Sequence, residues 1–395
     1  MNNSSSPFSH RSSKLWYLIC LLLFGYYAQG TLYPVGNPIS QSILTLIILI
    51  GLYELIASIF LSKQKLPVPL VMSILFWLLI ALTFLLSPPK VLGISTLSQF
   101  KDITAFFLPL FIGFQIGLKH KITLRQATIT SIIILGIAIM QYMQAWQLKL
   151  FSEEFTNNSA YYFLYIIPFV ALMYNKRLLL SATLMVVVFA FVMSGAKRGA
   201  IVCLGLCVIY MAYYYTREHG IGIKSFVVVA ILIGGAFYGV NYYLEHNAYL
   251  VKRLESTQEG STSGRDKLAE KLWDGWKEAS IIQQIVGRGS AQTLEVAGNY
   301  AHNDWLETLT NNGIIGVLLY LGLFYSFFKY RKKLARRSQV QLAYNLTLIF
   351  WFARTLFSMS MNIIGGLTMM MLGLFIGNRQ IEFRYNKLIS EANHD

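Results

Sequence analysis

The stretch "GNYAHNDWLETLTNNGIIGVLLYLGLF", residues 298–324, places an ionisable side chain directly before a long apolar run. Its histidine, His302, is followed by Asn303 and then by a sequence with the composition of a membrane helix. A histidine at such a boundary is more often a hydrogen-bonded structural residue than a catalyst. An imidazole is nonetheless the side chain best suited to accept a proton near neutral pH. His302 is therefore our candidate for a general base.

Four basic side chains on three other segments could bind an anion. Lys197 and Arg198 lie in "MSGAKRGA", Arg265 begins an amphipathic segment, and Arg288 lies between glycines in "VGRGS". Taken singly, each has an ordinary explanation: interfacial snorkelling, a solvated side chain, or a chance Gly-Arg-Gly. Arginine, however, grips phosphate with a planar fork, and glycine lets the backbone approach a ligand closely. Together these residues predict a site for an anionic group such as a phosphate.

Patterns for other kinds of chemistry are absent from the sequence. It contains no Asp-x-Asp motif and no Asp/Glu/His cluster for a divalent ion, and it has no P-loop or Rossmann glycine pattern. We therefore expect no metal and no cofactor. Glu153 and Glu154 could be a carboxylate pair, but their own loop would solvate them. Within the apolar runs, Glu54 and Arg354 are the main ionisable residues, fewer than a proton-coupled transporter usually needs. Arg354 could face the same site or form a structural ion pair.

The composition indicates what positions these residues. Of 395 residues, 55% are hydrophobic and only 13% are charged, whereas a soluble domain carries about 25% charged residues. Apolar runs of roughly 20 residues, each long enough to cross a bilayer as a helix, recur along the chain. We predict an all-α polytopic membrane protein, so the net charge of +15 need not mean nucleic-acid binding.

Twelve apolar runs are candidate transmembrane helices. They predict a tail at 1–14, nine helices within 15–244, one long loop at 245–302, three helices within 303–378, and a tail at 379–395. In the loop, Leu268, Leu272, Trp276 and Ala279 share one face of an expected helix. The approximate limits of the runs are 15–29, 39–61, 68–86, 102–118, 124–146, 160–174, 177–194, 199–215, 224–244, 304–328, 340–357 and 359–378.

Lysine and arginine in the connections predict the orientation. If the N-terminus is cytoplasmic, the inside segments hold 20 Lys and Arg, and the short outside connections hold 5. The positive-inside rule therefore places both termini in the cytoplasm. The loop 245–302 carries 7 basic and 8 acidic residues, but long translocated segments escape this rule. The excess charge is then a topology signal that also attracts anionic lipid.

The spacing from His302 to Gly313 and Gly316 resembles the signature of the O-antigen ligase and Wzy-type polymerase superfamily. In both, a histidine is followed by ten residues and a glycine. The run "SGRDKLAEKLWDGW…IVGRGS" is similar to the family's loop before that signature, and "SGAKRGA" resembles its earlier arginine-bearing membrane element. The sequence-level match covers mainly residues 193–325. The loop is short for the family, which puts its lid and acceptor-binding elements in doubt.

The resemblance implies a GT-C-like glycosyltransferase of the Gram-negative inner membrane, with its active site on the periplasmic face. Such a protein moves a glycan from undecaprenyl diphosphate to an acceptor sugar, without a metal and with inversion. A ligase uses the lipid A-core oligosaccharide as acceptor, whereas a polymerase uses another lipid-linked repeat. Membrane lipids would be further partners, and nucleic acid would not.

On this reading the basic residues clamp the diphosphate of the donor, and His302 activates the acceptor hydroxyl. Arg198 and Arg288 would form the clamp, with Arg265 and Lys197. His302, Leu306, Leu309 and Gly313 would share one helical face, and Gly313 and Gly316 would let another helix or the lipid tail approach. The supporting residues would be Asn303, Gly313, Gly316 and Arg354.

Alternative functions follow from the same residues. A repeat-unit polymerase or an O-linked protein oligosaccharyltransferase would use the same chemistry on another acceptor. Polymerases usually carry two substantial outer loops, and the single long loop of this chain favours the ligase. Outside the superfamily, a transporter of lipid-linked glycans would use the basic outer residues only to guide its substrate.

Overall fold

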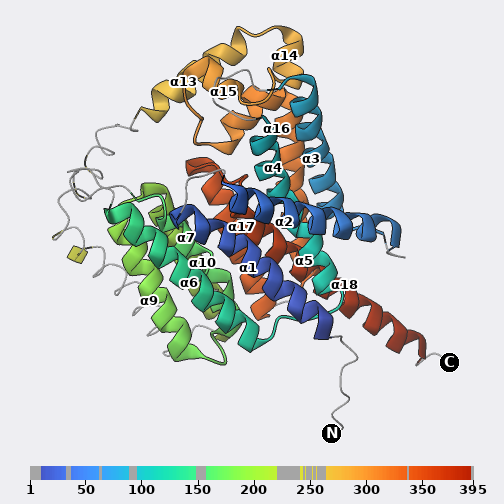
Figure 1. Ribbon diagram of the computed structural model, residues 1–395. Coiled ribbons are helices and arrows are strands. Elements are labelled where there is room, and N and C mark those ends of the chain that lie inside the picture. Colours follow the sequence, from blue (N-terminus) through green and yellow to red (C-terminus); the bar gives the residue numbers. More distant parts are fainter. Residues whose placement is uncertain are drawn as a thin grey trace.

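The described part of the chain is all-helical, as predicted. The computed structural model describes residues 10–32, 37–61, 65–88, 96–147, 157–219, 264–335 and 338–392, with a few single positions between 241 and 255, and this part of the chain contains no strand (Figure 1). The Ser-rich start of the N-terminal tail lies outside the described residues. In chain order the helices are α1 (His10–Leu32), α2 (Pro38–Ile56), a π-helical turn (Ala57–Leu61), α3 (Val68–Leu86), α4 (Thr96–Phe107), α5 (Pro109–Gly117), α6 (Leu124–Gln147), α7 (Ala160–Leu164), α8 (Ile167–Met173), α9 (Leu178–Ser194), α10 (Arg198–His219), α13 (Arg265–Lys277), α14 (Ile281–Val286), α15 (Gln292–Ala297), α16 (Asp304–Tyr330), a 3₁₀ turn (Arg331–Lys333), α17 (Gln339–Phe357) and α18 (Gly365–Ala392).

Several of these helices are long and apolar enough to cross a membrane, which makes this a multi-pass membrane protein. Six candidate spans occur among the described residues, together with three shorter apolar segments. Each run expected from the sequence falls on one described helix or, at 102–118 and 160–174, on two consecutive ones. The exception is the ninth run, 224–244, of which only 241 and 242 are described. The total of twelve spans therefore stays a prediction. The six spans are Pro38–Phe60, Val68–Leu86, Gln99–Gly117, Leu124–Gln147, Arg198–Glu218 and Asp304–Lys333.

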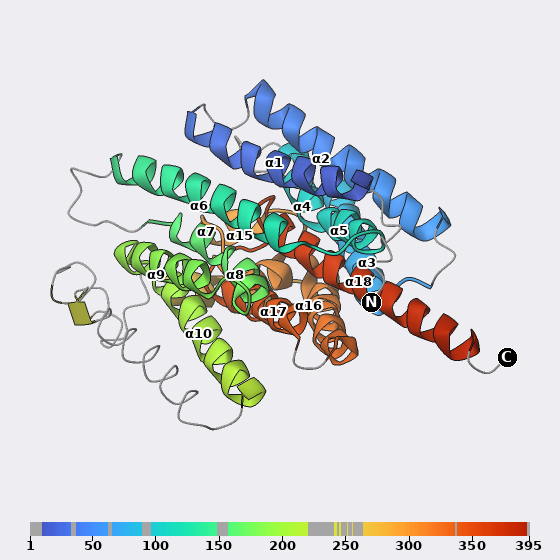
Figure 2. The same ribbon diagram turned by 90° about the horizontal axis from the view of Figure 1, so that it is seen from below.

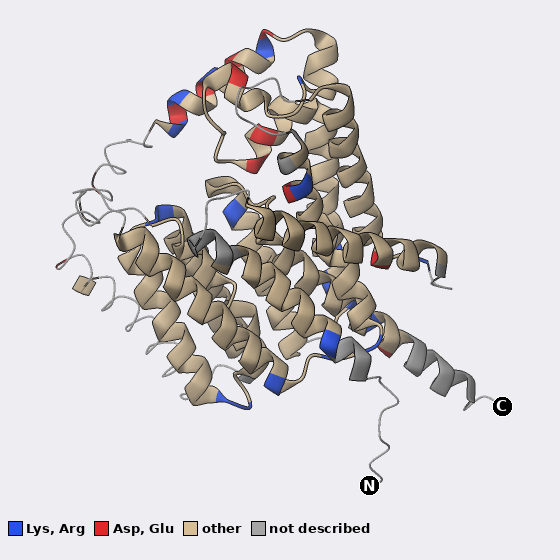
Figure 3. Ribbon diagram, viewed as in Figure 1, with Lys and Arg blue, Asp and Glu red and all other residues tan. Residues whose placement is uncertain are grey.

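The long helices form one body, and the short helices α13, α14 and α15 form a cap at one end of it, over α16 and α3 (Figure 1). Seen from below, α1, α2 and α6 lie along one side and α9 and α10 toward the other, with α17 and α18 between them (Figure 2). Helix α1 begins and α18 ends at the side opposite the cap. Lysine and arginine gather in the cap, where acidic residues accompany them, and at the helix ends on the opposite side (Figure 3).

Helices α5 and α18 pack at very short range in the middle of the body. Each carries glycines four residues apart on the contact face: Gly113 and Gly117 in α5, and Gly373 and Gly377 in α18. A methyl group on Gly373 would overlap the carbonyl oxygen of Leu110, and one on Gly113 would overlap backbone atoms of α18. Small residues at this spacing let two membrane helices approach until their backbones touch.

An aromatic cluster fixes α16 against its neighbours. Phe76 of α3 stacks on Tyr320 of α16, with ring centroids 4.9 Å apart. Phe324 of α16 lies 4.1 Å from the ring of Trp351 in α17. Such ring pairs stabilise a fold beyond the area that they bury. They hold the helix that follows His302 between α3 and α17.

Candidate active site

His302 lies in a tight turn immediately before α16. Its backbone has φ of 50°, in the left-handed region that histidine and asparagine visit more often than most residues. The side chain of Asn303 caps α16 by accepting hydrogen bonds from the N–H groups of Trp305, at 2.9 Å, and Leu306, at 3.2 Å. The predicted shared helical face was therefore wrong for His302, because the helix begins only at Asp304.

The surroundings of His302 favour its neutral form. The imidazole is half-buried, and burial lowers its pKa below the usual 6.5; the positive charges of Arg265 and Lys197 lower the pKa further. The neutral ring has a free lone pair to accept a proton. The structure thus brings together the histidine and two of the basic residues that were expected to share a site.

Arg265 and Asn303 meet at the carboxyl end of α17. Nη1 of Arg265 donates to the carbonyl oxygen of Phe357 at 2.9 Å, and Nδ2 of Asn303 donates to that of Leu356 at 3.3 Å. The last carbonyls of a helix lack partners within the helix, and the end carries partial negative charge. A cation here is therefore held in place, and the bond to Phe357 uses only part of its donor fork.

Lys197 and Arg198 lie where α10 begins. Both side chains are half-buried. The next residue, Gly199, is buried so closely that an added methyl group would overlap the hydroxyl of Tyr161 and the side chain of Phe357. The first turn of α10 therefore packs against the same end of α17 that Arg265 caps.

Arg354 lies inside the body and not at the surface. It is 5% exposed, and its guanidinium lies over the rings of Tyr161 and Tyr165, 5.4 and 5.8 Å from their centroids. It also donates a hydrogen bond to the hydroxyl of Tyr165. The aromatic rings accommodate this buried charge, which places a fixed cation beneath the corner formed by α7, α10 and α17.

Arg288 makes its contacts through the loop that carries it. Its guanidinium donates to the carbonyl oxygen of Gly275 in α13. Its backbone N–H donates to the carbonyl oxygen of Thr310 at 3.0 Å, and the N–H of Gly289 donates to that of Asn311 at 3.1 Å. In this conformation Arg288 ties the cap together and joins it to α16.

The glycine of the His-x10-Gly spacing forms a break in α16. Gly313 has φ of 62° and ψ of −162°, which are not helical, and the break leaves carbonyls of α16 open to the loop. A methyl group on Gly313 would overlap the backbone of Ile285 and Gly287. The partner that approaches Gly313 is therefore the end of the short helix α14 and the glycine that follows it, so another helix does approach here, as the sequence suggested. Gly316 is also buried, against Thr308 and Asn312 of its own helix.

Replacing Gly313 by alanine should displace the cap from α16 and slow the reaction at the candidate site about 100-fold, because small misplacements of a catalytic site cost that much. Gly298 provides the control, since it also has positive φ, of 74°, but has open space around it. Gly298→Ala should keep most of its activity. Reaction rates and limited proteolysis of the cap would be compared. Equal rates for the two variants would contradict this role of the close approach.

A polar cavity of about 180 Å³ lies beside the first turns of α16, between α3, α4, the start of α15 and the α17–α18 connection. Sequence reasoning missed it. Its lining includes no lysine or arginine among the described residues. The polar lining residues are Thr83, Gln99, Asp102, Ser290, Tyr300, Asp304, Glu307, Thr308, Asn311, Asn312 and Asn362.

Two carboxylates of α16 are built into the wall of this cavity. Glu307 accepts hydrogen bonds from the hydroxyl of Thr293, at 2.6 Å, and the N–H of Ala301, at 3.0 Å. Asp304, 1% exposed, accepts from the N–H of Ser360 at 3.0 Å. The sequence did contain one signal for these carboxylates. Acidic residues lie two and five positions after His302, in the first turn of a helix, where negative charge is favoured.

Among the described residues, three oxygens at the cavity have no hydrogen-bond partner. They are Oγ of Ser290, Oγ1 of Thr308 and Oδ1 of Asp102. Ser290 and Thr308 are 3% and 2% exposed. Buried polar atoms are seldom left unpaired. The cavity therefore has the character of a site for a neutral, hydroxyl-rich ligand.

The class of protein that such a fold and site suit is indicated by a family comparison, which points broadly to a membrane enzyme of the glycosyl-transfer type. Residues 182–321 match a family model described as O-antigen ligase. The matched segment runs from α9 into α16 and contains all four predicted cations of the clamp and His302. The match confirms the resemblance to the O-antigen ligase superfamily. No curated protein matches the chain.

Proposed function

We propose that this protein is an O-antigen ligase, which transfers a polysaccharide from undecaprenyl diphosphate to the lipid A-core oligosaccharide. The observation that carries the proposal is a half-buried histidine, His302, whose pKa is lowered by burial and by Arg265 and Lys197, inside the segment that matches the family model. A neutral imidazole beside two cations is what transfer from a diphosphate donor to a sugar hydroxyl would need.

In the proposed reaction, a hydroxyl of the acceptor sugar attacks the anomeric carbon of the donor glycan. His302 takes the hydroxyl proton as the new glycosidic bond forms. The bond from the anomeric carbon to the diphosphate breaks on the opposite face, and the diphosphate leaves with the electron pair, so the configuration inverts. Fixed cations stabilise this charge in a site of low dielectric. Arginine and lysine would supply the positive charge that a metal supplies elsewhere.

The proposed clamp includes Lys197 and Arg198 at the start of α10 and Arg265 at the start of α13. Arg354, buried behind them over two tyrosines, adds positive potential. We assign Arg288 to the same clamp as a cation that also fixes the cap, since it is bonded to Gly275. Asn303, Gly313 and Gly316 would position the start of α16.

The polar cavity suits the sugar part of the reaction. Its lining has carboxylates and amides but no cation among the described residues, so it disfavours a diphosphate and suits sugar hydroxyls. The cations near His302 and the acidic lining of the cavity support a division in which phosphates lie beside Arg265 and sugar lies beside Thr308.

Thr308→Val tests that division. Valine matches the shape of threonine, and the Thr308 hydroxyl has no partner within the described protein, so stability should not fall. If the hydroxyl binds sugar, KM for the acceptor or donor should rise about fivefold, the value of one hydrogen bond. Thr183→Val, at an exposed position of α9, is the control. An unchanged KM would show that the sugar does not bind in this cavity.

The orientation that we propose places the cap in the periplasm and both termini in the cytoplasm. The start of α1 and the end of α18, at the side opposite the cap (Figure 1), support it. The lysine and arginine residues at that side, where acidic residues are few (Figure 3), also support this orientation.

The decisive experiment is transfer in vitro with purified full-length protein and an undecaprenyl-diphosphate-linked glycan. Lipid A-core and a second lipid-linked repeat would be offered separately, each with and without chelator. Product on lipid A-core that survives chelation supports the ligase. Extension of the lipid-linked glycan would make the protein a polymerase, and product only on a protein acceptor would make it a protein oligosaccharyltransferase. No product with any acceptor would favour a transporter.

Arg265→Gln should move the acidic limb of the pH–rate profile to higher pH. Burial lowers the pKa of His302 most, and the Arg265 charge lowers it further. Without that charge the pKa rises toward 6.5, so the ring is protonated, and lost as a base, at a higher pH. Lys267→Gln, on the exposed side of α13, should leave the midpoint unchanged. A midpoint that does not move in Arg265→Gln would show that His302 is not the titrating base.

A further inference from the structure

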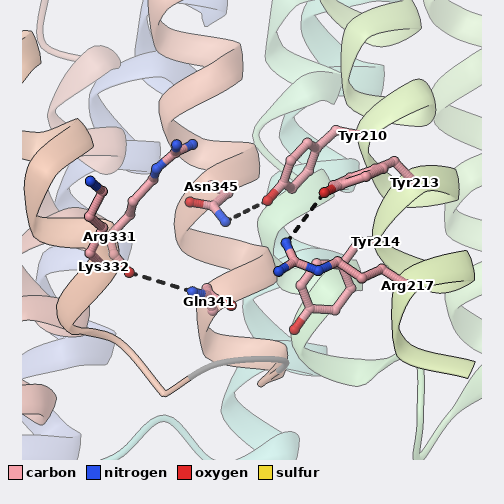
Figure 4. A pocket seen from close by; sticks show the side chains of 8 residues that line it. All are labelled: Tyr210, Tyr213, Tyr214, Arg217, Arg331, Lys332, Gln341 and Asn345. Atoms are coloured by element: carbon pink, nitrogen blue, oxygen red, sulfur yellow. Dashed lines mark hydrogen bonds between the residues drawn. The ribbon is translucent and has the colours of Figure 1, made fainter.

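A second cavity, of about 660 Å³, lies at the end of the body opposite the cap. It is formed where the last turns of α10 approach α17 and the 3₁₀ turn after α16 (Figure 4). The proposed transfer chemistry makes no use of it. Its lining residues are Tyr210, Tyr213, Tyr214, Arg217, Arg331, Lys332, Gln341 and Asn345.

The lining carries three positive charges and no carboxylate among the described residues. Arg217 comes from α10, whereas Arg331 and Lys332 come from a turn more than a hundred residues later. The acidic neighbour in sequence, Glu218, accepts a hydrogen bond from Tyr174. The cations therefore converge on the hollow from two separate segments, and no acid of the lining neutralises them.

Hydrogen bonds hold this arrangement in place. Asn345 donates to the hydroxyl of Tyr210 at 2.6 Å, and Nη1 of Arg217 donates to the hydroxyl of Tyr213 at 3.3 Å (Figure 4). The buried Tyr214 donates to the carbonyl of Ser338 at 2.8 Å. The ring positions and one arginine are thus set before any ligand binds, which lowers the ordering cost of binding.

The outer face of α10 leads from the lipid to this cavity. Val202, Leu206, Ile209 and Tyr213 are exposed and recur at spacings of four, three and four, so they form one stripe along the helix. Tyrosine is enriched where hydrocarbon meets headgroups. The cavity therefore lies where an apolar lipid-facing surface ends in a cluster of cations.

We infer that this pocket binds the phosphate-bearing headgroup of an anionic membrane lipid, with its acyl chains along the stripe on α10. Arginine grips phosphate oxygens through paired N–H groups, and lysine adds a point charge. Basic pockets between membrane helices bind anionic headgroups in this way. Free phosphate shares the headgroup chemistry, but it would gain nothing from the stripe. The inference does not depend on the proposed glycosyl transfer.

The test is lipid binding to the purified full-length protein by native mass spectrometry. The pocket variant carries Arg217→Gln, Arg331→Gln and Lys332→Gln together. The control variant carries Lys121→Gln, Lys176→Gln and Lys329→Gln, which remove the same charge outside the pocket lining. Phosphatidylglycerol and cardiolipin would be compared with phosphatidylcholine, and inorganic phosphate would be added as a competitor.

We expect the pocket variant to bind the anionic lipids about 100-fold more weakly, from three cations near the membrane surface. The control variant should lose little, and phosphatidylcholine should bind weakly to both. Equal losses of lipid affinity in the two variants would show that the lipid responds only to the overall surface charge, and this would overturn the inference. Full displacement of the lipid by millimolar phosphate would show a site for a soluble anion and overturn the lipid assignment.

Discussion

Replacing His302 by asparagine should lower the rate of glycan transfer by about 10²- to 10⁴-fold, the usual contribution of a general base. Asparagine tolerates the left-handed backbone of this position, where φ is 50°. It keeps a polar side chain of similar reach but cannot accept a proton at neutral pH. The loss would therefore arise from chemistry and not from a distorted turn. Transfer rates of purified proteins would measure it.

His120→Asn is the matched control, because His120 lies outside the site and contacts Gln126. It should transfer glycan at the normal rate. His302→Asn should also bind the lipid-linked donor normally, since the clamp is intact. A His302→Asn protein that transfers at the normal rate would exclude His302 as the base and leave the acceptor hydroxyl without a proton acceptor.

The second large effect is expected at the contact between α5 and α18. Leucine in place of Gly373 would force its side chain into the carbonyl of Leu110, and the two helices would have to separate. Overpacking of this kind costs about 3 kcal/mol or more when backbone is the obstacle. We expect a clear fall in the unfolding temperature in detergent and a low yield of folded protein.

Gly136→Leu in α6 controls for the cost of a larger side chain in a membrane helix, because nothing beyond the backbone of its own helix lies within 4 Å of a Cβ built there. It should unfold at nearly the normal temperature. Thermal unfolding followed by fluorescence would compare the two variants. Similar midpoints would mean that α5 and α18 separate at little cost, and that the aromatic cluster around Tyr320 holds the body together.

The fold could be read from the sequence to the extent that hydropathy determines it. The apolar runs predicted the long helices. Helical spacing of apolar residues predicted α13, in which Leu272 is buried. That helix ends at Lys277, so Ala279, expected on the same face, lies beyond it. The proximity of α5 and α18 was not expected, although both carry glycines four residues apart. Many glycine pairs occur in membrane helices, and only the packed structure shows which ones meet.

The candidate site was predictable where residue chemistry was enough and not where assembly was needed. His302, Arg265 and Lys197 were chosen by type, and they lie together. The break at Gly313 was missed because a helical period assumes regular dihedral angles. The cavity beside Thr308 was missed because its walls come from five separate parts of the chain. No single stretch of the sequence contains all of these walls.

The attachment of the cap to the body has a consequence for the divergence of such proteins. The N–H groups of Arg288, Gly289 and Ser290 bond to carbonyls of Thr310, Asn311 and Ser87, so main-chain atoms form these bonds on both sides. Any residue type supplies the same carbonyl. Side chains at these positions can therefore change while the joint itself persists. The glycines of this joint allow the two backbones to approach closely, so they are the positions that cannot be substituted.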